Sequence, residues 1–271
     1  MAIIECPSGL VLEARKLKVR DGQHLASKEA LRKGDLSDRI LRACWTATQD
    51  PGLYAAPPYE IGDKPIDWGK ILIGDRDVAL MQIRIASWGP DYEFRVQCDQ
   101  CDGMFLWEVD LSKIPVQPLS PESREVYRSG NRFTTNLLGK EIVWRLCTGS
   151  DALAMKRRSK KRKGDPDYTE NPLADGLEMR IVSVEGIKDR DERALRLWLE
   201  DLDFEDFGKL LAEFDRHDCG LETSLDVKCS DCNHVQEIEL PFDRGFFFPR
   251  TKKKTDQSTN ELEDATPTTT T

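Results

Sequence analysis

The sequence predicts an α+β fold built from short β-hairpins and amphipathic helices. Three observations lead to this class. Apolar and polar residues alternate over short runs such as Tyr92–Gln97, as they do in half-buried strands. Elsewhere apolar residues recur at helical spacing, as in the stripe that runs from Phe204 to Phe214. Two C-x-x-C motifs, at Cys98–Cys101 and Cys229–Cys232, each stand between strand-like segments.

The N-terminal region is expected to begin with a hairpin and continue with helices. We predict a hairpin over residues 3–12 and helices over residues 27–33, 37–48 and 75–87. A loop is expected over residues 55–65. The turn Pro7-Ser8-Gly9 separates the two apolar runs of the hairpin. Ser27 and Ser37 are suited to cap the first two helices. Asp75 suits the positive end of the third, because a helix dipole favours a carboxylate there.

The rest of the chain alternates between predicted strands and helices. Strands are expected over residues 105–111, 132–138, 141–147, 221–227 and 235–240. Helices are expected from Ser150 into a basic tract, over 171–184, over 190–199 and after Asp203. Gly139 separates the second strand from the third. Asp203 is a good N-cap residue for the last helix.

The domain organisation follows from the positions of the two cysteine motifs. We expect residues 1–250 to form a single α+β domain, with knuckles near 92–111 and 221–240 and a largely helical insertion between them. Residues 251–271 are rich in Lys, Thr and Glu and have almost no apolar side chains. They are predicted to form a disordered tail.

Composition narrows the functional class. The 271 residues carry a formal net charge of -9, which argues against a protein that coats nucleic acid or an anionic membrane. The longest apolar runs, such as Ile71-Leu72-Ile73, are far too short to span a bilayer. The first residues lack the basic and apolar regions of a secretory signal. We therefore expect a reducing cytosol, where paired cysteines are more often metal ligands than disulfides.

The two cysteine motifs have the same local pattern: a strand, C-x-x-C and a second strand. Such a turn at a hairpin tip points two thiolates at one spot, and two of them supply a tetrahedron that suits zinc. Asp102-Gly103 and Asn233-His234 supply residues that tolerate the left-handed backbone this turn needs. The sequence thus predicts a split zinc ribbon in which one structural Zn²⁺ is bound by Cys98, Cys101, Cys229 and Cys232.

The cysteines also allow other interpretations. A lone C-x-x-C can be a redox pair, but two in matched contexts favour a metal. The long separation between the pairs is unusual for a compact zinc ribbon. His234 is a possible ligand, but with four cysteines present a turn role is the better interpretation. The remaining cysteines are predicted to be small buried hydrophobic residues: Cys6, Cys44, Cys147 and Cys219.

A basic tract at residues 156–163 is the second salient feature. It can contact an acidic protein, bind nucleic acid or extend a helix into water. No aromatic residues interleave with it, so base stacking has little support. We favour contact with an acidic protein, or no specific role, over nucleic acid.

Catalytic patterns are absent from the sequence. The three histidines, His24, His217 and His234, do not suggest a nucleophile and its base. Gly74-Asp75-Arg76 lacks the spacing and the lysine of a phosphate-binding loop. We interpret Arg76 and Arg84 as pairing or packing groups. Four thiolates would leave no open position on the metal, so the site is predicted to be structural and the protein not to be an enzyme.

The order of several short segments resembles the baseplate hub assembly family of contractile-tailed bacteriophages of the T-even type. The segments are Cys6-Pro7-Ser8-Gly9, Ile73-Gly74-Asp75-Arg76, Ile83-Arg84 before Trp88-Gly89, Leu202–Phe207, Phe246–Pro249 and the two cysteine pairs. The resemblance covers roughly residues 3–249. It implies a structural or assembly role in the central hub of the tail baseplate, without enzymatic activity. It carries metal binding only onto the four cysteines named above.

The functional prediction is therefore protein–protein scaffolding, with other phage baseplate and tail proteins as partners. The protein would act in the host cytoplasm during assembly, as an assembly chaperone or as a virion component of the tail baseplate. A zinc-ribbon nucleic-acid-binding regulator is the alternative, although the acidic residues around the knuckles argue against it. A metalloenzyme is a further rival that needs an open metal position. Phe246–Pro249 is interpreted as core rather than contact surface.

Overall fold

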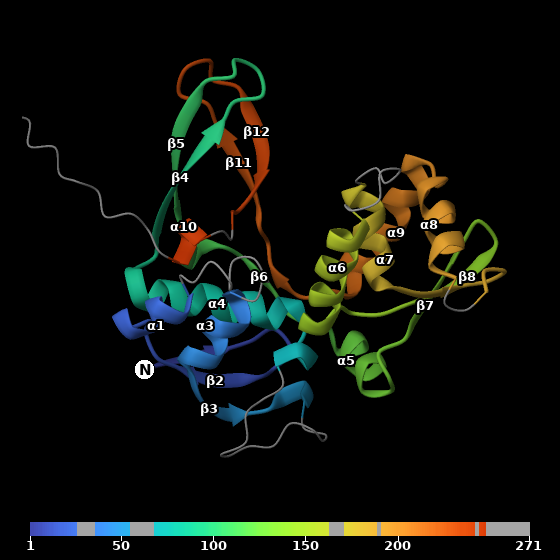
Figure 1. The fold of residues 1–271 in the computed structure, drawn as a ribbon, viewed down its shortest axis with the longest axis horizontal. Coiled ribbons are helices and arrows are strands. Elements are labelled where there is room, and N and C mark those ends of the chain that lie inside the picture. The colour runs from blue at the N-terminus through green and yellow to red at the C-terminus, as the bar shows by residue number, and fades with distance from the viewer. Residues whose placement is uncertain (26–35, 55–67, 163–170, 189–190, 242–243, 248–271) are drawn as a thin grey trace, which may run out of the picture. The chain divides into compact units, whose positions relative to one another are not determined.

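The structure is a computed structural model of the whole chain, and it describes residues 1–25, 36–54, 68–162, 171–188, 191–241 and 244–247. The chain divides into two compact units, Met1–Leu240 and Pro241–Thr271. The first unit contains several small antiparallel sheets together with helices, so the α+β class is confirmed (Figure 1). In the second unit the helix α10 (Arg244–Phe247) carries the buried Phe246 and Phe247, whose rings meet edge to face.

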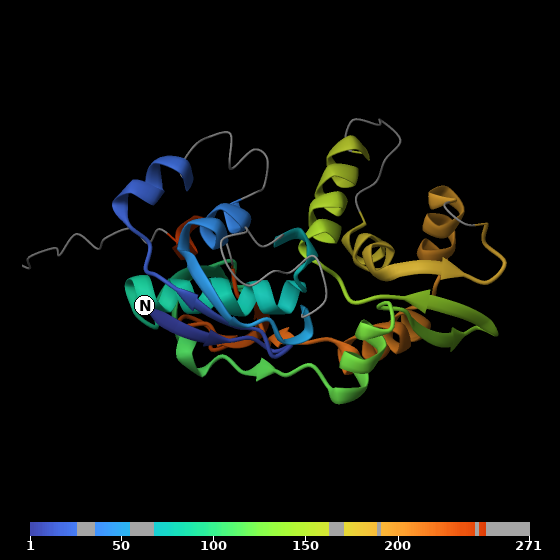
Figure 2. The same ribbon diagram turned by 90° about the horizontal axis from the view of Figure 1, so that it is seen from below.

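The N-terminal sheet has the order β1–β2–β3, from Ala2–Glu5, Val11–Ala14 and Trp45–Asp50. The predicted hairpin is confirmed, because β1 and β2 pair antiparallel around the Pro7–Gly9 turn. Figure 2 shows the sheet lying against α4 (Ile73–Trp88), which packs on β1 and on α3 (Leu36–Cys44). The helix α1 (Val19–Leu25) precedes α3, and short 3-10 turns occur at Gly52–Tyr54, Trp68–Lys70 and Leu111–Lys113.

Asp75 anchors the first turn of α4 to the hairpin turn. Its buried carboxylate accepts hydrogen bonds from the Ser8 N–H at 3.0 Å, the Ser8 hydroxyl at 2.5 Å and the Tyr54 hydroxyl at 2.7 Å. The Leu72 N–H in turn donates to the Tyr54 oxygen at 2.9 Å. Burial raises the pKa of Asp75, and the hydrogen bonds from Ser8 and Tyr54 oppose that rise. The residue predicted to favour a helix dipole thus also fixes where the helix begins.

A two-residue ladder marks where a long insertion leaves the first part of the chain and returns to it. β6 (Val116–Gln117) pairs antiparallel with β10 (Gly220–Leu221). The helices between them are α5 (Pro121–Arg128), α6 (Gly149–Arg162), α7 (Pro172–Arg180), α8 (Glu192–Glu200) and α9 (Phe204–His217). The sheet of this insertion has the order β7–β8–β9, from Phe133–Leu137, Lys140–Trp144 and Ile181–Val184.

Two predicted helices are shorter than expected, because each one ends where a strand begins. The helix predicted over 37–48 stops at Cys44, and Trp45–Asp50 becomes β3, paired with β2. The helix predicted over 171–184 stops at Arg180, and Ile181–Val184 pairs with β8. Both errors have the same cause. A β-branched or aromatic segment takes the strand conformation once a distant strand offers it hydrogen bonds.

The strand predicted over 221–227 is divided between β10, which pairs with β6, and β11 (Ser224–Lys228), which pairs with β12 (Val235–Glu239). Most other predicted elements are confirmed, with boundaries that shift by a few residues. Asp203 caps α9 as predicted, accepting a hydrogen bond from the Asp206 N–H at 2.8 Å. The apolar stripe of α9 is only partly buried: Leu210 and Phe214 lie in the core, whereas Phe204 is 82% exposed. The predicted helix over 27–33, the loop over 55–65 and the tail over 251–271 lie outside the described residues.

Two glycines let α4 and β10 approach backbone to backbone. A Cβ atom on Gly74 would overlap the Cys219 carbonyl oxygen and stand 2.9 Å from the Gly220 Cα.

We expect Gly74→Ala to lower the free energy of unfolding by about 1–3 kcal/mol, because the neighbouring backbone must move. Gly176 is the matched control: nothing lies within 4 Å of its would-be Cβ. Gly176→Ala should stabilise α7 by about 1 kcal/mol. Urea denaturation measures both, and equal effects at the two sites would contradict the close approach.

Candidate metal centre

Two hairpins form the walls of the candidate site. The first joins β4 (Asp91–Gln97) to β5 (Met104–Asp110), and the second joins β11 (Ser224–Lys228) to β12 (Val235–Glu239). Each pairs antiparallel without a register shift. Figure 1 shows the two hairpins side by side, with their turns at the same end. Alternate residues of β4 are buried, ending at Cys98, so the strand period aims this thiol inward.

The two C-x-x-C turns share one hydrogen-bond pattern. In the first, the Cys98 N–H donates to the Gly103 carbonyl at 2.9 Å, and the Asp102 N–H donates to the Cys98 carbonyl at 2.9 Å. In the second turn, the Cys229 N–H donates to the His234 carbonyl at 2.8 Å, and the Asn233 N–H donates to the Cys229 carbonyl at 3.1 Å. Asp102 and Asn233 have φ values of 56° and 62°, the left-handed conformation predicted for these positions.

The four thiols of the two turns converge. Cys98 and Cys232 bring their Sγ atoms to 3.5 Å, and Cys101 and Cys229 bring theirs to 3.8 Å. All four Sγ atoms lie within 4.8 Å of one another. A regular tetrahedron with zinc–sulfur bonds of about 2.3 Å has sulfurs about 3.8 Å apart. The four cysteines therefore lie close enough together to hold a metal ion.

The four thiols of the cluster differ in exposure and in the direction of their pKa shifts. All eight cysteines of the chain are free thiols. Cys98 and Cys229 are buried, whereas Cys101 is exposed and Cys232 is intermediate. Backbone N–H groups of Cys101 and then Gln100 lower the pKa of Cys98 to about 7. The Gly103 N–H lowers the pKa of Cys101, but the neighbouring thiols together outweigh this and raise that pKa to about 12. The pKa of Cys232 is raised as well. His234 contributes its carbonyl to the turn, and its ring is not among the groups that converge.

Gln236 links the two hairpins beside the thiols, a role that the sequence analysis missed. Its amide Nε2 donates to the Gln97 carbonyl at 2.9 Å, and its Oε1 accepts from the Asp99 N–H at 3.0 Å. A side chain of the second hairpin thus holds the backbone on both sides of Cys98. The signal was a polar residue on the buried side of β12. Phe105 occupies the corresponding position, four residues after the second cysteine, in the first hairpin.

The other cysteines are buried in the core, as predicted. Burial raises the pKa of Cys44 to about 11 and that of Cys147 to about 12. Burial also raises the pKa values of Cys6 and Cys219 strongly. These thiols stay protonated near neutral pH, so they behave as small apolar side chains.

A serine–histidine contact elsewhere resembles a catalytic pair in its composition. The Ser123 Oγ lies 3.0 Å from the His217 Nδ1, and an Arg216 guanidinium nitrogen lies 2.9 Å from the His217 Nε2. Because arginine can only donate, Nε2 accepts and Nδ1 carries the proton toward Ser123. Ser123 is completely buried. The contact therefore joins α5 to α9 and does not activate the serine as a nucleophile.

The two predicted arginines are pairing groups, as expected. Arg76 forms an ion pair with Asp38 of α3. Arg84 donates to the Gly89 carbonyl at 2.8 Å and lies over the Tyr92 ring, 5.8 Å from its centroid. Within the described residues, no helix is long and apolar enough to cross a membrane.

Comparison with protein families gives a match to a model described as T4 bacteriophage base plate protein, over residues 59–248. The matched region contains all four converging cysteines. Searches of curated proteins and of solved structures found no match.

Gln236 supplies a test of the contact between the hairpins. Gln236→Leu leaves the Gln97 carbonyl and the Asp99 N–H without their partner, so we expect the free energy of unfolding to fall by about 1–3 kcal/mol. Gln97→Leu is the control, because the side chain of Gln97 is exposed and only its carbonyl takes part. Chemical denaturation measures the change. Equal stability of the Gln236→Leu protein and the parent would show that the amide does not hold the hairpins.

Proposed function

The chain belongs to the T4 bacteriophage base plate protein family, and on this basis we propose that it helps to build the base plate hub and that one structural zinc ion holds its fold together. Membership of the family makes it a structural protein of the phage tail base plate. The hub role and the identity of the metal are our proposals. The observation that carries them is the convergence of four thiols from two hairpins within the matched region.

The donor set favours zinc. Four thiolates are soft ligands, and a tetrahedral S₄ site selects zinc or iron. The separations of 3.5 Å and 3.8 Å between paired sulfurs fit a single ion of that geometry. In this proposal Cys98, Cys101, Cys229 and Cys232 are the metal ligands and His234 is a turn residue. A bound ion would supply charge neutralisation for the thiolates and a cross-link between the hairpins.

The proposed ion would act mechanically. Cys101 and Cys229 are 128 positions apart in the sequence. Closing a loop of that size stabilises a folded chain by about 4–5 kcal/mol in the chain-entropy model. Four protein ligands leave no coordination position for water or substrate, which supports a structural role over a metalloenzyme. The acidic residues around the hairpins give no support to a nucleic-acid-binding regulator.

In the proposed assembly role the protein binds other proteins of the phage tail. The cysteine hairpins give one rigid element, and the insertion between β6 and β10 gives a second region for contacts. We propose that the chain acts in the host cytoplasm during assembly and is incorporated at the centre of the base plate. Residues 1–250 are proposed to form the working domain and residues 251–271 a tail.

The metal proposal predicts a stoichiometry. Elemental analysis of the purified protein by inductively coupled plasma mass spectrometry should find one zinc ion per chain. The protein should show no visible absorbance from bound iron. Cys229→Ser should lose the metal and unfold at lower temperature, because metal binding and folding are linked. Lowering the pH should release the ion, since protons compete for the thiolates.

Ser230→Ala is the matched control for the metal test. Ser230 is exposed, lies in the same turn and is not a ligand in the proposal. It should keep both metal and melting temperature. The Cys229→Ser protein can fail to fold. Cys101→Ser, which changes the exposed cysteine of the cluster, therefore gives a second measurement of metal content. Full metal content in both cysteine variants would overturn the proposal.

The hub proposal predicts a location. An affinity tag fused to this chain should co-purify with other tail proteins from infected cells, and electron microscopy should find the label on the base plate axis. A label confined to the base plate periphery would contradict the hub role while leaving the metal proposal intact.

A further inference from the structure

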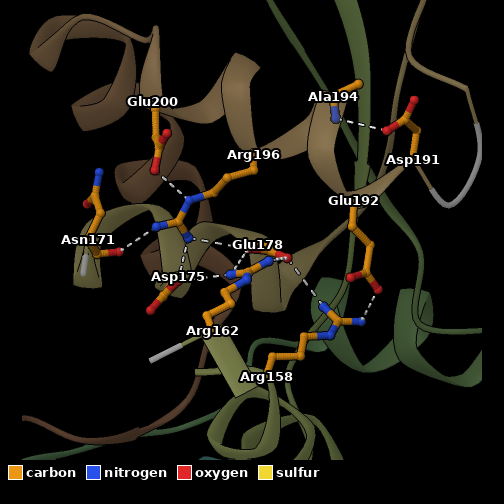
Figure 3. Close-up of polar contacts among 10 residues, drawn as sticks. All are labelled: Arg158, Arg162, Asn171, Asp175, Glu178, Asp191, Glu192, Ala194, Arg196 and Glu200. Atoms are coloured by element: carbon orange, nitrogen blue, oxygen red, sulfur yellow. Dashed lines mark hydrogen bonds and ion pairs between the residues drawn. The ribbon is translucent and has the colours of Figure 1, made fainter. Parts of the chain in front are cut away.

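The basic tract on α6 has two faces: one pairs with carboxylates of the same chain, and the other is exposed. Figure 3 shows Arg158 and Arg162 turned toward carboxylates of α7 and α8. Arg162 makes two bonds to Glu178, at 2.7 Å and 2.8 Å. Arg158 reaches Glu178 at 3.5 Å and Glu192 at 3.2 Å. These two arginines therefore pair within the chain, although Arg158 also remains in contact with solvent, with 42% of its side chain exposed.

A third arginine completes this inner network. Arg196 of α8 pairs with Asp175 and bonds Glu200 at 2.6 Å (Figure 3). The Glu178 side chain is only 1% exposed, so the network fixes the rotation of α6 against α7. Three arginines here face four carboxylates: Asp175, Glu178, Glu192 and Glu200. The inner face of α6 is therefore neutralised within the chain.

The outer face of α6 remains basic. Successive helix residues are turned by about 100°, so positions 156, 157 and 160 lie away from 158 and 162. Arg157 and Lys160 are both exposed, whereas the exposed Lys156 already acts electrostatically on Asp77 of α4. The ion pairs around the buried Glu178 orient α6 so that Arg157 and Lys160 face outward and form a basic surface.

The two cysteine hairpins are strongly acidic, as are residues 200–218, which hold eight carboxylates and two basic residues. The hairpin residues 91–110 and 224–239 contain ten carboxylates and two basic residues, a net charge of -8 in a chain of -9. Several of these carboxylates are directly opposite one another across a ladder. Asp226, for example, directly faces Glu237. Like charges in such pairs destabilise a hairpin, and a cationic partner removes that cost.

We propose that the outer basic face of α6 docks on the acidic hairpins of a second copy of this chain. Both surfaces are exposed, and they are complementary in charge. Because the two surfaces differ, the contact is head to tail, and repetition of it closes a ring or extends a filament. Complementary charge also speeds the encounter of the copies and fixes their register. The inference goes beyond the proposed hub role.

Sedimentation of the full-length protein tests the docking. The parent should self-associate in about 0.1 M NaCl and dissociate in about 1 M, where charges are screened beyond about 3 Å. Arg157→Glu with Lys160→Glu should weaken association about tenfold or more, because it places like charges together. Asp226→Lys with Glu237→Lys should do the same. A protein carrying all four changes should associate again, to within about threefold of the parent.

Lys188→Glu with Arg193→Glu is the matched control, since both residues are exposed and lie outside the two surfaces. It changes net charge by the same amount as the α6 variant and should associate like the parent. A parent that stays monomeric at low salt, a control as defective as the α6 variant, or a combined variant that stays apart would each overturn the proposal. DNA capture by a monomeric parent, lost in the α6 variant, would overturn it in favour of nucleic acid.

Discussion

The meeting of four sulfur atoms from two distant hairpins is the constraint on which the structure depends. The paired thiols are 128 and 134 positions apart in the sequence, yet their sulfurs come within 3.8 Å. Local turns only aim two sulfurs each. The backbone must bring the tips together, and it does so with the β6–β10 ladder, the contact of Gly74 with Gly220, and the Gln236 amide. Each of these joins segments on either side of the insertion.

The sequence predicted the features that neighbouring residues determine. The left-handed positions at Asp102 and Asn233 follow from the requirements of a C-x-x-C turn, and the Asp203 cap follows from side-chain chemistry. Features that depend on distant partners were missed. Trp45 and Ile181 take strand conformation because β2 and β8 lie beside them, which no local spacing reveals. The roles of Gln236 and Arg162 depend in the same way on groups elsewhere in the fold.

The ion network of α6, α7 and α8 serves orientation more than stability. Buried ion pairs lose hydration when they form, so their net contribution to the free energy of folding is small. Removing one partner is costly, because the other charge stays buried. Glu178 is bound by Arg162 of α6 and lies near Arg196 of α8, so a rotation of α6 would take Arg162 away from this buried carboxylate. A run of basic residues that looks uniform in the sequence thus contains two kinds of side chain. Some, such as Arg162, pair with carboxylates of the same chain, and others, such as Arg157, are exposed.

The β6–β10 ladder also bears on how such a chain can change during evolution. The insertion starts and finishes within one pair of adjacent two-residue strands, so its two ends are neighbours in space. Segments with adjoining ends can be exchanged, enlarged or lost without stretching the parent fold. The two cysteine hairpins lie on either side of the insertion in the sequence, so its length can change while both hairpins keep their own residues.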